Sequence, residues 1–498
     1  MDAEFIQNIY LFVNWDLGYT LLIHDVNCQF MTNLKIQNKT EILKNNYSGS
    51  LSLTLEAIEA GLQSVNPTSI IKKSVLVKRN YLTVTDFSGK KIDFNLGGFK
   101  SIYLVGAGKA TASMSDAFMR ILKKEKVKSC CITIPYGIST KNKLCTVTHA
   151  SHPIPDSNGV LGTERILQIL EKVKKNDFVV MLLSGGASAL MPLPIDIINL
   201  KEKRKITKKL LSSGATIDEM NTVRKHLSKV KGGRLAEIVN RRFRLLTLIL
   251  SDVVNDKIDV IASGPTVPDL TTFEDAKKVL VKYKIWNNNK IVSFKLRKLV
   301  SDGISGYIKD TPKPGNRIFS NINNVIIGNN TIACQNIKLF LERKGIKTMY
   351  LGSSFTGKAA DLGSFLFRLV NDFPSILTPY AFVLGGETTV DLKNRTNGIG
   401  GRNQEAVLSA TSLFKNLNKE MDFTITSFGT DGIDGNSTAA GAVVNPQMML
   451  RITQQGLKIS KYLKNHDSNT LFNNMNGAIY TKITGTNVND VSIVCRLR

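Results

Sequence analysis

The 498-residue sequence has no run of 18 or more apolar residues, the length that a membrane-spanning helix needs. We therefore expect no membrane partner. Cysteine is also scarce, since the six cysteines form no CxxC pair and no disulfide-rich spacing. This pattern predicts reduced thiols and an intracellular protein, with the cytoplasm favoured and the mitochondrion as the alternative compartment.

Acidic residues are few beside basic ones: 40 Asp and Glu against 66 Lys and Arg give a net charge of +26. Such a charge is compatible with a nucleic-acid partner, an anionic substrate or a lysine-rich proteome. The basic runs carry few aromatic residues and no nucleic-acid-binding motif, so solvated helix faces are favoured over a specific nucleic-acid partner. The runs cover residues 123–128, 201–209 and 241–244.

Histidine is scarce as well, with five residues in the chain. His149 and His152 lie near each other, but no third nitrogen or sulfur ligand is close in sequence, so a zinc site is not expected. No histidine has an evident serine partner, which gives no support to a serine–histidine hydrolase.

The first 45 residues form an undetermined N-terminal arm. Four acidic residues between Asp2 and Asp25 argue against a mitochondrial transit peptide, which is normally poor in acids. An apolar stretch at residues 5–13 lacks a basic flank and a small-residue cleavage site.

From about residue 50 the sequence alternates helix-like and strand-like segments. Residues 51–64 have helical spacing, and short apolar runs bounded by glycine then recur, each followed by a helix-like stretch. Such βα units predict α/β domains with parallel sheets, in which ligands bind beyond the carboxyl ends of the strands. The expected strands are residues 102–105, 130–135, 178–183, 245–250, 325–327, 348–351, 380–384 and 423–428.

The chain is too long for one ordinary core, so at least two domains are expected. Residues 282–323 are rich in Lys, Asn, Asp, Gly and Pro, which is typical of a linker. We place the boundary there and expect domains at residues 46–315 and 316–498.

Residues 102–112 predict a buried strand, a glycine turn and the start of a helix. Backbone N–H groups at such a start can converge on an anion, and Gly106 and Gly108 would let a phosphate approach the backbone. Lys109 adds positive charge where phosphoryl transfer would develop negative charge. A phosphate site and a plain tight turn both remain open.

Two familiar nucleotide motifs do not fit this turn. A Walker A loop would need glycine at Tyr103 and Ser or Thr at Ala110. The dinucleotide motif would need glycine or alanine at Thr111.

Residues 184–190 form a second glycine turn after a strand. A nucleophile elbow would need glycine at Leu190, so Ser188 is a weak hydrolase candidate. Binding of a carboxylate or phosphate by Ser184, Gly185, Gly186 and Ser188 is favoured, with a plain turn as the alternative.

Residues 213–234 combine a helix start with basic residues. Thr216 and Glu219 fit a capping box. Arg224 and Lys225 could hold an anion, although surface charge is the more frequent explanation for such residues.

Several acids follow predicted strands. Asp252 stands where a carboxylate could bind Mg²⁺, or could cap a helix. Glu387 and Asp431 lie among glycines after two later strands, and Arg402, at a glycine-rich helix start, could clamp phosphate. Together with Asp434 these residues predict a cleft for an anionic, metal-bound ligand.

From about residue 50 onward the motifs resemble those of the class II, or MOFRL-type, glycerate kinases, and they occur in the family's order. The similar segments are residues 106–110, 152–156, 184–190, 221–228, 231–233, 250–254, 262–266, 327–330, 385–390, 400–405, 430–435 and 484–490.

The resemblance implies an ATP- and Mg²⁺-dependent kinase acting on D-glycerate, with the 2-hydroxyl favoured as acceptor. It implies a Rossmann-like N-terminal domain, a C-terminal MOFRL domain and an active site between them. Lys109 and Arg402 match the family's two basic catalytic residues. Asp252 is our candidate for accepting the hydroxyl proton, and Asp431 and Glu387 are our candidates for Mg²⁺.

The sequence also departs from the family. Asn255 replaces a usual glycine, and residues 436–438 replace a usual Pro-Thr-acid segment, so no role is transferred to that acid. The alternatives are an NAD(P)H-dependent hydroxypyruvate reductase, a basic nucleic-acid-binding protein and an inactive family member. The expected partners are D-glycerate and ATP, and a homo-oligomer is one option for the assembly.

Overall fold

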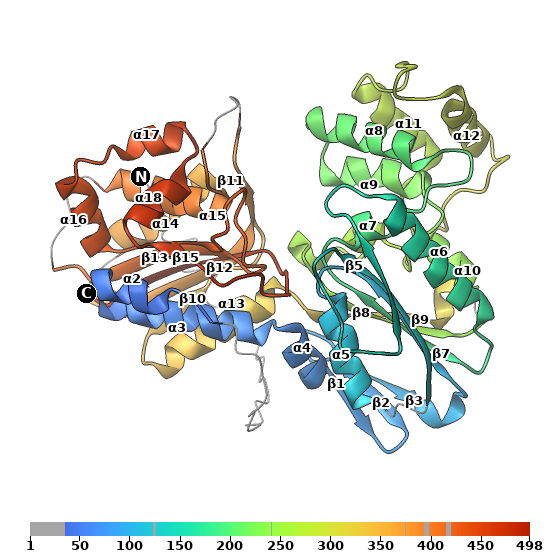
Figure 1. Ribbon diagram of the computed structural model, residues 1–498, viewed down its shortest axis with the longest axis horizontal. Coiled ribbons are helices and arrows are strands. Elements are labelled where there is room, and N and C mark those ends of the chain that lie inside the picture. Colours follow the sequence, from blue (N-terminus) through green and yellow to red (C-terminus); the bar gives the residue numbers. More distant parts are fainter. Residues whose placement is uncertain (1–34, 123–125, 241, 374, 393–397, 415–419) are drawn as a thin grey trace. The chain divides into compact units, whose positions relative to one another are not determined.

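The computed structural model describes residues 35–122, 126–240, 242–373, 375–392, 398–414 and 420–498. Most of the expected N-terminal arm lies outside these residues, as do residues 123–125 and 241 of the basic runs. In the described part of the chain, no helix is both long and apolar enough to cross a membrane. The strands in these ranges form three sheets (Figure 1).

The first large sheet has six parallel strands in the order β6-β5-β4-β7-β8-β9. Five of them confirm strands expected from buried apolar runs. The edge strand β6 was not predicted, because its residues alternate between buried and exposed positions. The strands are β4 (Ile102–Ala107), β5 (Val127–Pro135), β6 (Cys145–Ala150), β7 (Phe178–Leu183), β8 (Arg244–Leu250) and β9 (Ile322–Gly328).

Both faces of this sheet are covered. Along β4, Leu104 belongs to one hydrophobic cluster while Tyr103 and Val105 belong to another, as alternate residues of a doubly covered strand must. The helices around the sheet are α4 (Pro67–Ser74), α5 (Thr111–Ile121), α6 (Ser157–Lys172), α7 (Ala187–Leu190) and α10 (Arg234–Val239). A small antiparallel sheet comprises β1 (Val75–Lys78), β2 (Tyr81–Thr85) and β3 (Lys91–Asn95).

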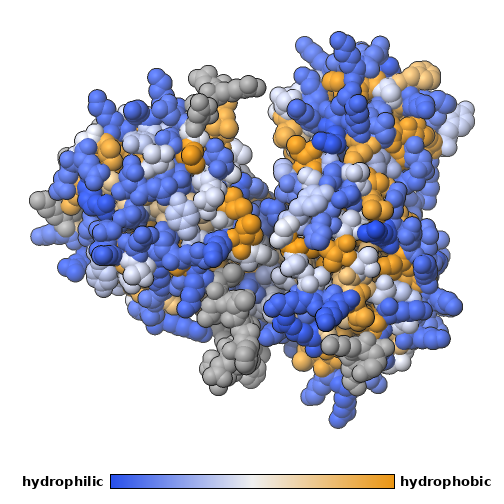
Figure 2. Space-filling model, in the orientation of Figure 1, coloured by the Kyte–Doolittle hydropathy of each residue, from blue (hydrophilic) through white to orange (hydrophobic). Residues whose placement is uncertain are grey.

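Four more helices pack around a hydrophobic cluster of their own. They are α8 (Leu200–Ser212), α9 (Ile217–His226), α11 (Phe273–Lys282) and α12 (Phe294–Ile304). The expected capping box at Thr216 and Glu219 is confirmed at the start of α9. Hydrophilic residues cover most of the face visible in Figure 2. On α8 the exposed basic residues are Lys201, Arg204, Lys205, Lys208 and Lys209, as expected for a solvated face.

The second large sheet is mixed: β12 pairs parallel with β10 and β11, as expected, but the remaining pairs are antiparallel, and there the expectation of parallel pairing is wrong. Its order is β10-β12-β16-β13-β14-β15, with β11 also paired to β12. The strand β16 is antiparallel to both of its neighbours, β12 and β13. The strands are β10 (Lys347–Tyr350), β11 (Phe355–Lys358), β12 (Tyr380–Thr389), β13 (Phe423–Gly429), β14 (Gly441–Val444), β15 (Ala478–Ile479) and β16 (Asp490–Arg496).

Helices from both ends of the chain pack on this sheet. The expected helix at residues 51–64 is confirmed as α3 (Gly49–Ser64), which follows α2 (Lys39–Asn46) and contacts α13, β13 and β16. In Figure 1 the blue helix α3 lies beside α13. The later helices are α13 (Asn330–Arg343), α14 (Ala359–Asn371), α15 (Arg402–Leu413), α16 (Pro446–Gln454), α17 (Ile459–Lys464) and α18 (Ser468–Asn474).

Two segments pack with the sheet on the other side of the predicted domain boundary at residue 315. The strand β9, which follows that position, belongs to the first sheet, and α3, which precedes it, packs on the second. The boundaries at residues 46, 315 and 316 stay a prediction.

The expectation of reduced thiols is wrong for one pair of cysteines. Cys130 and Cys145 form a disulfide between β5 and β6, where they are register partners. This pair was not predictable from cysteine spacing, because the two residues become neighbours only when β5 and β6 pair. Cys131, Cys334 and Cys495 are free and buried.

Candidate functional site

The two glycine turns of the first sheet interlock. At the turn after β4, the Lys109 N–H donates to the Gly185 carbonyl at 2.8 Å. The Ala110 N–H donates to the Ser184 hydroxyl at 3.0 Å. Because these amides already have acceptors, positive charge at this turn comes from the Lys109 ammonium rather than from free backbone N–H groups.

Gly106 and Gly108 are required for this close packing. A β-carbon on Gly106 would lie 2.4 Å from the Leu182 carbonyl oxygen. Gly108 has a φ of +141°, and a β-carbon there would lie 2.1 Å from the Ser184 hydroxyl oxygen. The packing accounts for both glycines, and contact of either with a phosphate stays a prediction.

The second turn has free donors. The N–H groups of Gly185 and Gly186 donate to no oxygen of the described residues. Gly186 has a φ of +84°, and a β-carbon there would lie 2.8 Å from the His152 ring. These two amides, held next to charged side chains, could receive a carboxylate or phosphate oxygen.

Asp252 follows β8 and lies against the second turn. A β-carbon on Gly185 would be 2.3 Å from Asp252 Oδ2, so the carboxylate occupies the space that this glycine leaves. Burial, the largest cause, raises the pKa of the Asp252 carboxyl to about 6. The Lys109 ammonium opposes the shift, while the Glu387 carboxylate adds to it. A carboxyl with this pKa is mostly ionised at pH 7 and can still accept a proton.

Lys109 joins the first sheet to the second. Its Nζ lies 3.4 Å from Asp431 Oδ2, and about a quarter of each side chain is exposed. His152 interacts electrostatically with both side chains. Burial and the Lys109 ammonium lower the pKa of the His152 imidazole to about 4, and the Asp431 carboxylate opposes this shift. His152 is therefore a neutral imidazole at pH 7.

Arg402 is already engaged by two carboxylates. Its Nε and Nη2 donate to Asp490 at 2.5 and 3.1 Å, and its Nη1 donates to Glu387 at 2.7 Å. Burial disfavours the charged guanidinium, but the carboxylates of Asp490 and Glu387 hold the pKa of Arg402 above its ordinary value. Arginine has five N–H donors, so two remain for a ligand.

The acids predicted to bind Mg²⁺ are each paired with a cation. Asp431 faces Lys109, and Glu387 faces Arg402. Over the described ranges, no group of three or more His, Cys, Asp or Glu side chains could hold a metal ion. Mg²⁺ usually takes one or two carboxylates together with substrate phosphates. Asp431 and Glu387 could supply the one or two carboxylates that a phosphate-bound metal ion takes.

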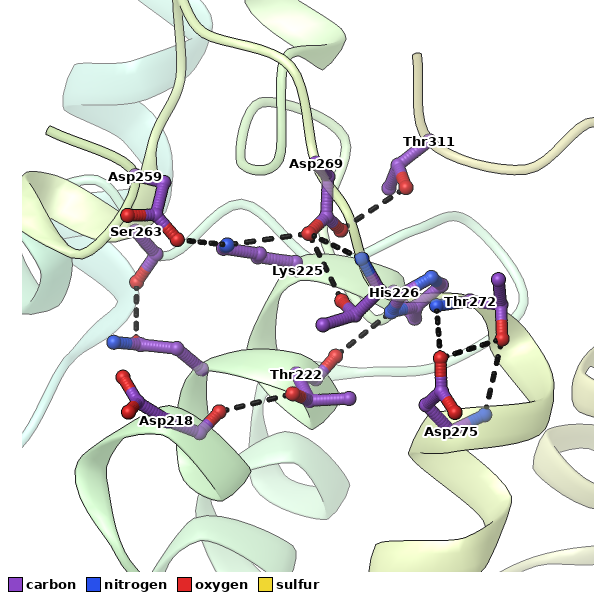
Figure 3. Close-up of polar contacts among 12 residues, drawn as sticks. Asp218, Thr222, Lys225, His226, Asp259, Ser263, Asp269, Thr272, Asp275 and Thr311 are labelled. Atoms are coloured by element: carbon purple, nitrogen blue, oxygen red, sulfur yellow. Dashed lines mark hydrogen bonds and ion pairs between the residues drawn. The ribbon is translucent and has the colours of Figure 1, made fainter. Parts of the chain in front are cut away.

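Arg224 and Lys225 have different surroundings. The Lys225 Nζ lies 3.2 Å from Asp259 and 3.2 Å from Asp269, as Figure 3 shows. Arg224, the preceding residue of α9, makes no hydrogen bond or ion pair with a described residue. Of this predicted pair, Lys225 is paired with two carboxylates, and contact of Arg224 with a ligand stays a prediction.

The two departures from the family pattern have structural explanations. Asn255 has a φ of +63°, a region where asparagine is tolerated better than other non-glycine residues. Asp434 accepts hydrogen bonds from the N–H groups of Asn403 and Gln404, so it caps the start of α15. Asn436 holds the preceding glycine loop through the Gly400 N–H.

The structure brings together most of the predicted site residues and adds three. Lys109, Asp252, Asp431, Gly185 and Gly186 surround one region, and Arg402 with Glu387 borders it. Sequence reasoning missed His152, Asn487 and Asp490 as members. Asn487 Nδ2 would lie 3.3 Å from a β-carbon on Gly185, and Asp490 is register partner to both Gly386 and Gly429. All three residues lie in segments that resemble the family's motifs, and this resemblance could have indicated them as site residues.

Comparisons with known proteins match the chain to two family models and to several relatives. A family model described as a domain of unknown function (DUF4147) matches residues 53–295, and the MOFRL family model matches residues 380–490. Glycerate 2-kinase of Pyrococcus horikoshii is 37% identical over 443 residues, covering 88% of this chain and 96% of the relative.

Similarity to Thermotoga maritima proteins extends to the structure. The D-glycerate 2-kinase of that organism is 35% identical over 446 residues, covering 89% of this chain and 97% of the relative. The crystal structure of a glycerate kinase from Thermotoga maritima is similar with a TM-score of 0.75 at 34% identity, covering 89% of this chain and 98% of that chain.

Proposed function

The chain belongs to the MOFRL-type (class II) glycerate kinases, and on that premise we propose that it transfers the γ-phosphoryl group of ATP to D-glycerate. The 2-hydroxyl is the favoured acceptor, because relatives that cover nearly the whole chain are named glycerate 2-kinases. The observation that carries the proposal is the meeting of Lys109, Asp252 and Asp431 beside two free backbone amides.

Asp252 is proposed to accept the proton of the reacting hydroxyl. The hydroxyl oxygen attacks the γ-phosphorus, its proton passes to the Asp252 carboxylate, and the bond from the γ-phosphorus to the bridging oxygen breaks to release ADP. The raised pKa of Asp252, caused mainly by burial, makes it a better base than an exposed aspartate.

Lys109 and Arg402 are proposed to neutralise the transferring phosphoryl group. Phosphoryl transfer needs positioning and charge stabilisation more than covalent chemistry. The Lys109 ammonium can move from Asp431 to a phosphate oxygen, since its 3.4 Å contact is long for a charged hydrogen bond. Arg402 can offer its two remaining N–H donors without leaving Asp490.

The second turn is proposed to hold an oxygen of the substrate. Gly185 and Gly186 present free amides, and Ser184 fixes the two turns against each other. Contacts of Gly106, Gly108 and Arg224 with substrate are proposed from their sequence motifs, and Ser188 is proposed to act through its hydrogen bond with Lys231.

Mg²⁺ is proposed to accompany the ATP phosphates. Asp431 and Glu387 are the residues that would hold it. When bound, the ion would neutralise charge on the phosphate oxygens. The alternative functions, a hydroxypyruvate reductase and a nucleic-acid-binding protein, are not favoured.

The test is a product analysis of wild-type protein with D-glycerate, ATP and Mg²⁺. Enolase added without phosphoglycerate mutase converts 2-phosphoglycerate to phosphoenolpyruvate and leaves 3-phosphoglycerate unchanged. ADP release with phosphoenolpyruvate formation supports transfer to the 2-hydroxyl. ADP release with phosphoenolpyruvate formed only after mutase is added contradicts the acceptor position, and no ADP release contradicts the kinase proposal.

A further inference from the structure

Behind the second glycine turn, Lys203, Lys231 and Arg224 interact electrostatically with one another and have no acidic partner among the described residues. The Lys231 side chain is buried, and its Nζ donates to the Ser188 carbonyl at 2.8 Å, the Ser188 hydroxyl at 3.0 Å and the Ala262 carbonyl at 3.3 Å. The Lys203 Nζ donates to the Pro192 carbonyl at 3.2 Å. All four acceptors are neutral, and Arg224 has no partner among the described residues.

Buried lysines normally have a carboxylate beside them. Lys225, one residue from Arg224, follows this rule, with Asp259 and Asp269 on its ammonium (Figure 3). Lys203 and Lys231 are 6% and 2% exposed and do not follow it. Lys203 is also the buried exception among the exposed basic residues of α8.

The three charges repel one another. Burial and the Arg224 guanidinium lower the pKa of Lys203 to about 7. Burial, with Lys203 and Arg224, lowers the pKa of Lys231 well below its ordinary value. An oxyanion bound between these groups would relieve both the repulsion and the loss of hydration.

Hydrogen bonding fixes which group can meet such a ligand. The Ser263 hydroxyl donates to Asn221 Oδ1 at 3.0 Å, so the 2.9 Å contact between Ser188 and Ser263 is donated by Ser188. The Ser188 hydroxyl therefore accepts from Lys231 and has no proton left for a ligand. The half-buried Arg224 guanidinium retains all of its N–H donors.

We propose that Arg224, Lys203 and Lys231 form an oxyanion pocket beside the second glycine turn, with Arg224 as the group that binds the ligand directly. This inference rests on the proposed function, because the pocket adjoins the turn that also contacts Lys109 and Asp252. Ser188 is two residues from Gly186. A β-carbon on Gly186 would lie 3.5 Å from Lys109 Cγ, so the Lys109 side chain lies next to this turn.

The shared ligand chemistry is a carboxylate or phosphate group. In a three-carbon hydroxy acid the carboxylate is directly bonded to the carbon that bears the 2-hydroxyl, so a carboxylate in this pocket would direct that hydroxyl toward the neighbouring Asp252. Lys203 and Lys231 are positioning residues, because they act through the charge of the pocket and through Ser188.

The first experiment compares Arg224→Gln with Arg204→Gln, which removes the same charge from an exposed position of α8. Losing a charged hydrogen bond is expected to raise the KM for the anion bound here by about 10- to 100-fold. A raised KM for D-glycerate with an unchanged KM for ATP identifies the carboxylate. A raised KM for ATP alone identifies a phosphate. Unchanged constants in Arg224→Gln overturn the pocket.

The second experiment needs no turnover and covers an Arg224 variant that fails to fold. Lys203→Met removes a buried charge without a counter-charge, so the ligand-free Tm is expected to rise, while the Tm increase caused by D-glycerate or inorganic phosphate becomes smaller. A lower ligand-free Tm with full protection by both anions overturns the pocket. Absence of ADP release by wild-type protein refutes the proposed function instead, and phosphate protection still tests the pocket.

Discussion

Lys109 and Asp431 form an ion pair between two sheets, with 3.4 Å between Nζ and Oδ2 and a separation of 322 positions in the sequence. Lys109 follows the carboxyl end of β4, and Asp431 follows that of β13. Both residues act on Asp252: the Lys109 ammonium lowers the pKa of its carboxyl, and the Asp431 carboxylate raises it. The account of catalysis depends on this convergence.

The pH dependence of activity should report Asp252. Its carboxyl must lose a proton to act as a base, and burial raises its pKa to about 6. We therefore expect kcat/KM for D-glycerate to fall below pH 6 with a slope near one and to level off above it. Initial rates from pH 5 to 8 measure this.

The matched variant is Asp252→Asn, which cannot accept the proton. Its kcat is expected to fall by about 10²- to 10⁴-fold, without the acid limb of the profile. Because a raised folded-state pKa means that the ionised carboxylate destabilises the fold above the unfolded-state pKa, the variant should have a higher Tm at pH 7. An Asp252→Asn enzyme with wild-type kcat would remove Asp252 from the mechanism.

Gly185→Ala tests the contact between the second turn and the base. The added methyl would meet Asp252 Oδ2 at 2.3 Å and must displace it. We expect kcat to fall by about 10²-fold, since a shift of about 1 Å has this effect, while the fold is kept. Gly98→Ala is the control, because a β-carbon there has no atom within 4 Å. Equal activity of the two variants would show that the Asp252 position is unimportant.

The Arg402–Asp490 pair makes a prediction about stability. Arg402→Met leaves the Asp490 carboxylate, which is 8% exposed, without its cation, and should lower the free energy of unfolding by about 3 kcal/mol. Adding Asp490→Asn removes the stranded charge and should recover much of the loss. Urea unfolding of both proteins measures this. If the double variant is no more stable than Arg402→Met, the pair is not coupled as described.

Local sequence patterns predicted five of the six strands of the first sheet and the glycine turns after β4 and β7. Buried parallel strands are continuous apolar runs, and residues 178–183 show this pattern clearly. The capping box at Thr216 was also predictable from a local pattern, because its donors and acceptors are only three residues apart.

Long-range partners were not predictable from local patterns. Nothing near Arg402 indicates that Asp490, 88 residues later, takes up its Nε, or that Asp434 caps α15. The strand β16 was not predicted, and its position between β12 and β13 depends on residues far apart in the sequence. The unpaired state of Arg224 beside the paired Lys225 likewise appears only once α9 is packed.

The most direct test of the account is a coupled ADP-release assay with D-glycerate, ATP and Mg²⁺ on wild-type protein and Lys109→Ala, with exposed Lys175→Ala as the control. We predict turnover by the wild type and by Lys175→Ala, and a loss of about 10²- to 10³-fold in kcat for Lys109→Ala. Undiminished turnover by Lys109→Ala, or none by folded wild-type protein, would contradict the account.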